Sequence, residues 1–117
     1  METAPPREVF DRQAALERVE GDTELLEEVT QLFLDSSPKL LSQIGQAVSA
    51  RDAQALNRAA HTLKGSVANL AADAAFQAAF RLEKIGRQGQ LDGAEEAYAA
   101  LQLEMQRLLQ VLISYVE

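Results

Sequence analysis

Apolar residues recur every three or four positions along most of the chain, which is the spacing of one face of an α-helix. The longest such run lies in residues 23–50, with apolar side chains at positions 25, 29, 32, 33, 40, 44 and 48. The pattern contains no sequence repeat and no low-complexity segment. It predicts helices over residues 12–19, 23–50, 53–70, 73–90 and 97–116.

Polar residues at the segment boundaries support this division. Asp11, Asp22 and Asp52 each precede a predicted helix, where a carboxylate can accept hydrogen bonds from the first free N–H groups. Asp73 lies near the start of the fourth helix. Pro38 falls inside the long second segment, and we expect it to kink that helix or to split it in two, because proline lacks an N–H group.

The connections between the four long helices are only a few residues long, so consecutive helices are expected to pack antiparallel. We therefore predict an all-α fold: an up-down-up-down antiparallel four-helix bundle with a short additional N-terminal helix. The 117 residues suit a single core. Residues 1–8, which contain Pro5 and Pro6, are expected to form a flexible tail, and residues 9–117 the helical domain.

The amino-acid composition excludes several kinds of functional site. The chain has no cysteine, which excludes disulfides, thiolate catalysis and cysteine-ligated zinc, and a single histidine argues against a transition-metal site. We expect no metal and no cofactor of its own. The N-terminus lacks the pattern of a signal peptide, and no apolar stretch approaches the roughly 20 residues of a membrane span. The predicted location is cytoplasmic, with no membrane partner.

Charge is distributed unevenly. The net charge is −7, which argues against nucleic acid as a partner. Residues 51–87, called the basic segment below, nevertheless carry six basic and three acidic side chains, a net of +3, against −10 for the remainder. This contrast has two explanations: solvated helix faces that happen to be basic, or a surface that meets an anionic partner.

The only histidine, His61, lies on the predicted outer face of its helix. At about 100° per residue, Leu63 and Val67 fall within roughly 40° of Leu56 and form a buried stripe. His61 lies near 140° and Gly65 near 180° on the same scale. The ordinary explanation for such a histidine is a surface residue without a function.

Two neighbours argue for more than that. Gly65 occupies an exposed helical position at a cost of about 1 kcal/mol relative to alanine, and its missing side chain would let another surface approach the imidazole. Lys64, three residues after His61, can reach an anion attached to the ring. The combination is typical of an accessible nucleophile with a cationic assistant.

Glu83 is predicted to stand opposite His61. It occupies an inward position of the fourth helix, where an apolar residue is expected, and the turn between the two helices falls near residues 71–72. Because both residues are about equally far from that turn, an antiparallel hairpin places them at one level. Glu83 could then accept the ring N–H of His61 and orient it. Pairing of Glu83 with Lys64 or Arg87 is an equally good geometric alternative.

At these residues the chain resembles histidine-containing phosphotransfer (HPt) domains. Residues 61–66 read HTLKGS, which is similar to the family pattern of His, two residues, Lys, Gly and Ser. Residues 10–34 are similar to the family's first two helices, residues 40–61 to the run before the histidine, and residues 81–91 to the following helix. The resemblance thus extends over nearly the whole chain.

The resemblance implies that His61 accepts a phosphoryl group from a receiver-domain aspartyl phosphate and returns it to another receiver domain of a two-component phosphorelay. Lys64 would be the phosphate's charge partner, Gly65 the clearance position and Glu83 the residue that orients the imidazole. The chain has no phosphate-binding glycine loop, so it should be a phosphohistidine carrier without ATP-dependent kinase activity. The alternative is a catalytically silent docking module of the same fold.

The implied partners are the receiver domains of response regulators and hybrid sensor kinases, which would supply the Mg²⁺ and the acidic pocket. The chain itself is expected to be a monomer. We predict a docking surface that consists of Arg58, Gly65, Ala68 and Arg87. Ala71 departs from the family, which commonly has glycine there, and is expected to stiffen the helix end. Phe80 lies off the inward stripe, as either a docking contact or a packed rim residue.

Overall fold

The structure, a computed structural model, describes residues 8–116, and this part of the chain contains five helices and no strand. The helices are α1 (Arg12–Arg18), α2 (Thr23–Ala50), α3 (Ala53–Asn69), α4 (Asp73–Gln88) and α5 (Ala94–Val116). The predicted all-helical class is therefore confirmed for the described residues. None of these helices combines the length and the apolar character needed to cross a membrane.

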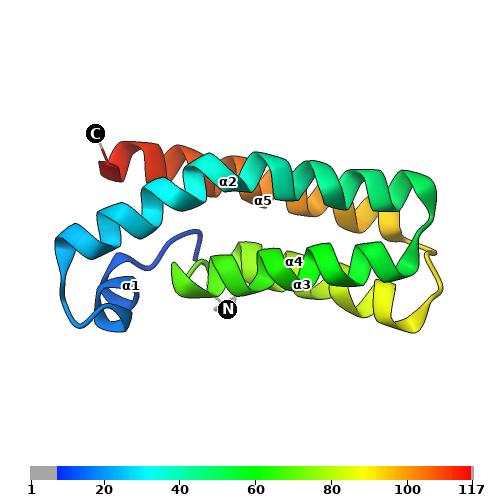
Figure 1. Cartoon of the computed structure of the whole chain (residues 1–117), viewed down its shortest axis with the longest axis horizontal. Helices are drawn as coiled ribbons and strands as arrows, with labels where there is room; N and C mark the ends of the chain where they lie inside the picture. The colour runs from blue at the N-terminus through cyan, green and yellow to red at the C-terminus, as the bar shows by residue number, and fades with distance from the viewer. Residues whose placement is uncertain (1–7, 117) are drawn as a thin grey trace, which may run out of the picture.

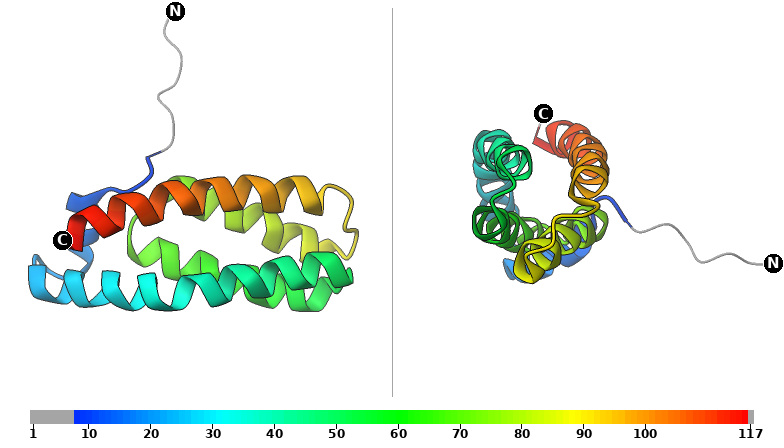
Figure 2. Two further views of the ribbon diagram at one scale, coloured as in Figure 1. Left: turned by 90° about the horizontal axis from the view of Figure 1, so that it is seen from above. Right: turned by 90° about the vertical axis from the view of Figure 1, so that its right-hand side faces the viewer.

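The four long helices surround one core. In Figure 1, α2 and α4 run in one direction along the molecule and α3 and α5 in the other. Each of α2, α3 and α4 contacts the next helix along the chain, and α2 also contacts α5; the view along the helices in Figure 2 shows the same ring. The most extensive contact joins α3 and α4. The largest fully buried side chains include Leu26, Ile44, Leu56, Leu63, Leu70, Leu82, Leu101, Met105, Leu108 and Leu112.

Three aspartates begin helices as predicted. The Oδ1 atoms of Asp11, Asp22 and Asp52 each accept a hydrogen bond of 3.0 Å from the backbone N–H three residues later. Such a bond satisfies one of the donors left free at a helix start and stabilises the helix by about 1 kcal/mol. Asp73 instead is the first residue of α4, whose N-cap position is occupied by Ala72 without a side-chain bond.

Pro38 lies within α2, which continues from Thr23 to Ala50. Of the two outcomes expected at this proline, the split is wrong, and the ribbon in Figure 1 shows α2 changing direction near its middle instead. Proline removes one intrahelical hydrogen bond, but the buried side chains of Phe33 and Ile44 hold the helix against the core on both sides of it. Core packing therefore outweighs the local break.

The site depends on how closely α3 and α4 approach each other. A Cβ atom on Gly86 would lie 2.6 Å from the backbone nitrogen of Asn57 and 2.8 Å from the carbonyl oxygen of Ala53. Both distances are too short for any side chain, because backbone atoms cannot move aside cheaply. Gly86 thus allows α4 to lie directly on the first turns of α3, and this contact sets the position of Glu83 one turn earlier.

The turn between α3 and α4 is stabilised by the N-terminal segment. The Asp11 N–H donates to the carbonyl oxygen of Ala71 at 3.2 Å, and the Ala74 N–H donates to that of Glu8 at 3.0 Å. The Phe10 ring packs edge-on against Tyr115, with 5.9 Å between centroids. Residues 1–7 of the predicted tail lie outside the described residues.

Ala71 corrects an expectation from the sequence. Helix α3 ends at Asn69, so Ala71 is not part of the helix that it was expected to stiffen. It has a φ of 53°, in the left-handed region, where a Cβ atom crowds the backbone at a cost of about 1–2 kcal/mol. The turn therefore places an alanine in a conformation that glycine adopts without strain.

Candidate functional site

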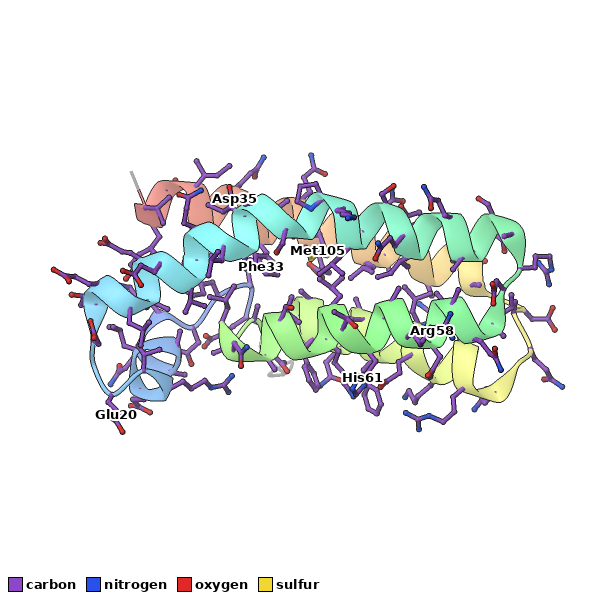
Figure 3. The ribbon with its side chains drawn as sticks, viewed as in Figure 1. Glu20, Phe33, Asp35, Arg58, His61 and Met105 are labelled. Atoms are coloured by element: carbon purple, nitrogen blue, oxygen red, sulfur yellow. The ribbon has the colours of Figure 1, made fainter. Side chains whose placement is uncertain are left out.

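His61 projects from α3 into solvent. Its side chain is 68% exposed, whereas Leu56, Leu63 and Val67 on the opposite face of the helix are fully buried. Figure 3 shows the residue on the side of α3 and α4 that is turned away from α2 and α5. The helical phase predicted this orientation. The imidazole is thus open to an approaching molecule while its helix is fixed by the core.

Glu83 reaches the imidazole from α4. Its Oε2 atom contacts His61 Nδ1, and its side chain is only 3% exposed although it carries a charge. A carboxylate can only accept here, so Nδ1 carries the proton and donates it. In a neutral imidazole the other ring nitrogen, Nε2, then has a free lone pair. The antiparallel α3–α4 hairpin therefore places the two residues at one level, as the sequence predicted.

The second oxygen of Glu83 holds two cations. Lys64 Nζ lies 2.7 Å from Oε1, and Arg87 Nη2 lies 3.4 Å from the same atom. The two pairings considered as alternatives to the His61 contact thus occur together with it. The Lys64 side chain is 20% exposed, whereas that of Arg87 is 61% exposed. The cluster contains one buried carboxylate with an imidazole on one oxygen and two cations on the other.

The pKa of Glu83 reflects this environment. Burial raises it, but hydrogen bonds and positive charge from Lys64 and His61 lower it by more, so that the net direction is downward from 4.5. The carboxylate is therefore ionised at neutral pH despite its burial. An ionised Glu83 favours a protonated Nδ1 and can balance positive charge that develops on the ring.

Asn57 is part of the site and was not predicted from the sequence. Its Nδ2 donates to the backbone carbonyl oxygen of Glu83 at 3.1 Å, directly across the α3–α4 contact. Asn57 lies one turn before His61, on the face of α3 that also carries Lys64. In the sequence, Asn57 is only a polar residue on the same helix face as His61. Its role cannot be inferred until the residue of α4 that it faces is known.

The four predicted docking residues occupy different places. Gly65 is exposed, and a Cβ atom added there would meet nothing within 4 Å. Ala68 is half-buried and lines an open groove with Phe76 and residues of α1, whereas Arg58 is exposed and lines a groove between α2 and α3. Arg87 alone among them contacts the Glu83 cluster. The fold itself does not require glycine at position 65, and the docking role stays a prediction.

Phe80 lies beside the cluster on α4 and is half-buried. The ammonium groups of Lys64 and Lys84 lie 4.8 and 4.6 Å from its ring centroid, and its centroid is 6.2 Å from that of Phe76. The ring thus packs at the rim of the bundle in contact with a residue of the site, and its role as a docking contact stays a prediction.

Comparisons with known proteins concern the family and the fold of the chain. A family model described as Hpt domain matches residues 28–111. The structure is similar to the crystal structure of histidine-containing phosphotransfer protein B (HptB) from Pseudomonas aeruginosa PAO1, with a TM-score of 0.85 over 97% of this chain and 96% of that chain, at 24% sequence identity. The likeness at this identity concerns the fold. A search of curated proteins finds no match.

Proposed function

The chain belongs to the Hpt domain family, and from this premise we propose that it carries phosphoryl groups on His61 between receiver domains of a two-component phosphorelay. His61 accepts the group from the aspartyl phosphate of one receiver and passes it to the aspartate of another. The observation that carries the proposal is the exposed imidazole whose Nδ1 is held by the buried Glu83 carboxylate.

The chemistry follows from the two nitrogens of the ring. The lone pair of Nε2 attacks the phosphorus atom, a P–N bond forms, and the P–O bond to the receiver's aspartate breaks, which releases a carboxylate. The Nδ1 proton stays in its hydrogen bond to Glu83, so no proton has to leave. Positive charge that develops on the phosphorylated ring is balanced by the ionised Glu83. The return step reverses the same bonds.

Lys64 is the charge partner of the phosphoryl group in this proposal. Its ammonium shares the Glu83 carboxylate with His61, so it already lies beside the reacting ring. The negative oxygens of a phosphoryl group on Nε2 offer Lys64 a second anion. The Lys64 ammonium has three donor protons, so it can contact the phosphate while it stays on Glu83, and Arg87 is a second cation on Glu83 Oε1 that helps to neutralise the carboxylate.

The frame that we propose for this chemistry is an up-down-up-down four-helix bundle preceded by the short α1, acting as a monomer in the cytoplasm. The opposite directions of successive long helices and the contacts of α2 with both α3 and α5 support it. The receiver partner, from a response regulator or a hybrid sensor kinase, supplies the Mg²⁺ and the acidic pocket. Arg58, Gly65, Ala68 and Arg87 form the docking surface around His61.

A transfer assay with a phosphorylated receiver domain tests the function. The wild-type chain should gain phosphate that is labile in acid and stable in base, as expected of a phosphoramidate, whereas His61→Gln should gain none. A receiver that binds the chain without losing its phosphate would favour the silent docking module instead. Equal labelling of wild type and His61→Gln would exclude His61 as the acceptor.

A further inference from the structure

Lys64 is held on two sides by chemically different groups. Its Nζ atom donates to Glu83 Oε1 at 2.7 Å and lies 4.8 Å from the centroid of the Phe80 ring. The Phe76 ring is farther away, with its centroid 6.0 Å from the same atom. Only 20% of the Lys64 side chain is exposed. A lysine on a helix surface would ordinarily extend into water.

The physical chemistry of lysine makes the ring contact significant. A lysine side chain has four rotatable bonds and a strongly hydrated ammonium, so one ion pair at the protein surface fixes it poorly. The face of an aromatic ring attracts a cation within about 6 Å, and the attraction grows when water is excluded. Both conditions are met at Lys64, because its ammonium lies over the Phe80 ring at 4.8 Å from the centroid and only 20% of its side chain is exposed.

Phe80 is not explained by packing of the core. The buried face of α4 consists of smaller residues and Leu82, with Ala75 and Ala79 fully covered. Phe80 lies off this face and stays half-buried. A leucine would cover a similar apolar area at this position. The property that only an aromatic residue adds is the electron-rich ring face beneath the ammonium groups.

We propose that Phe80 is a positioning residue: its ring holds the Lys64 ammonium on Glu83, and Lys64 in turn keeps the Glu83 carboxylate aligned on His61 Nδ1. The inference extends the phosphotransfer role proposed above, because it names a residue that affects the reaction without touching the phosphoryl group. Loss of the ring would let Lys64 move into solvent and leave Glu83 less firmly oriented. The helix would keep its position.

Two substitutions at position 80 separate the ring from its bulk. Phe80→Leu keeps an apolar side chain but removes the ring face, whereas Phe80→Tyr keeps the ring. Phe76→Leu is the matched control, since it removes a ring of equal size from the same face of α4 at the limit of cation–π range. All variants should keep the far-ultraviolet dichroism of the wild type.

The first readout is phosphoryl acceptance from a phosphorylated receiver. Phe80→Leu should be about three- to tenfold slower than wild type, the range that the loss of one partly desolvated cation–π contact converts to. Phe80→Tyr and Phe76→Leu should stay within about twofold of the wild type. Equal slowing by Phe80→Leu and Phe76→Leu would mean general loss of packing and would overturn the proposal.

The second readout is independent of phosphotransfer. In the free wild-type protein the Lys64 Cε protons should be shifted upfield by the ring current of Phe80, and the ammonium protons should be protected from exchange by the Glu83 contact. Phe80→Leu should abolish both signatures, and Phe76→Leu should keep them. Retention of protected ammonium protons in Phe80→Leu would overturn the inference even if the wild type transfers phosphate. Conversely, a wild type that accepts no phosphate defeats the proposed function, while this spectrum still tests the positioning of Lys64.

Discussion

At the level of single residues, Glu83 joins the exposed imidazole of His61 to two neighbouring cations. One carboxylate oxygen contacts the imidazole and the other contacts Lys64 and Arg87. Burying a carboxylate is costly unless positive and hydrogen-bonding partners compensate, and this site supplies three. The partners that compensate the cost of burial also keep Glu83 ionised, so that it can accept a hydrogen bond from the His61 ring.

The depressed pKa of Glu83 predicts how stability depends on pH. Burial raises this pKa, but the hydrogen bonds and positive charges of Lys64 and His61 lower it by a larger amount, so that the net shift is downward from 4.5. The folded state thus binds the Glu83 proton less tightly than the unfolded state does. Glu83 therefore contributes stability that is fully present above its unfolded pKa and is lost as the pH falls through the folded value.

Urea unfolding of wild type and Glu83→Gln between pH 7 and pH 3 measures this effect. The wild type should exceed the variant in free energy of unfolding at pH 7, and the difference should shrink below about pH 4.5. Repeating both measurements in a His61→Gln background removes the imidazole, while Lys64 and Arg87 still hold Glu83. A difference that is constant with pH would show that the ionised carboxylate does not stabilise the fold.

At the level of helices, the two interior glycines of the hairpin predict opposite responses to alanine. A Cβ atom on Gly86 would collide with the backbone of α3, whereas one on Gly65 would project into open space. Gly86→Ala should therefore destabilise the protein by about 2 kcal/mol and slow transfer, because α4 carries Glu83 away from His61. Gly65→Ala should stabilise it by about 1 kcal/mol, the difference in helix propensity.

Thermal and urea unfolding measure the stabilities of these two variants. A transfer assay tests separately whether a side chain at position 65 obstructs the receiver. Gly65→Gln should leave the helix intact and still slow transfer, since the longer side chain obstructs an approaching receiver. A Gly65→Gln variant with the wild-type rate would remove the clearance argument. A Gly86→Ala variant as stable as wild type would show that α4 can shift on α3 without loss.

The left-handed turn residue Ala71 predicts a stabilising substitution. Ala71→Gly should raise the free energy of unfolding by about 1 kcal/mol, because glycine adopts its φ of 53° without a Cβ clash. Ala99→Gly, at an exposed position inside α5, is the matched control and should lower stability by about 1 kcal/mol. Equal destabilisation by both changes would contradict the assignment of strain to position 71.

These elements show how far the sequence alone could reach. The hydrophobic spacing and the aspartate caps depend only on residues that are close in the sequence. The caps therefore predicted where α1, α2 and α3 start, and the spacing predicted that His61 points outward. Equal spacing from one turn also predicted that Glu83 would face His61. The Asn57 bond to Glu83 and the Phe80 ring beside Lys64 could not be predicted in this way, because they depend on how the two helices are rotated and how closely they pack. The continuous α2 through Pro38 likewise depends on its packing against the core.

At the level of the whole molecule, the net charge of the chain and the net charge of the segment that carries the site have opposite signs. The chain is acidic overall, with a net charge of −7, yet His61 lies within the basic segment, residues 51–87, whose net charge is +3. A receiver domain that presents an acidic pocket would be repelled by the whole molecule and attracted by this part of it. Over distances longer than about 10 Å salt screens such forces, so the local charges near the site should dominate the final approach.

The dependence of the transfer rate on ionic strength therefore distinguishes attraction by the basic segment from repulsion by the net charge. If the basic segment governs docking, the rate of transfer at low receiver concentration should fall by about tenfold as salt is raised from low to high concentration. If the net charge governs, salt should screen repulsion and the rate should rise. Arg58→Gln should reduce the salt dependence, whereas Arg107→Gln, the same change of charge on α5 where Arg107 pairs with Glu104 at 3.1 Å, should not. Equal effects of the two variants would mean that the receiver senses total charge, and the basic segment would then be only a solvated helix surface.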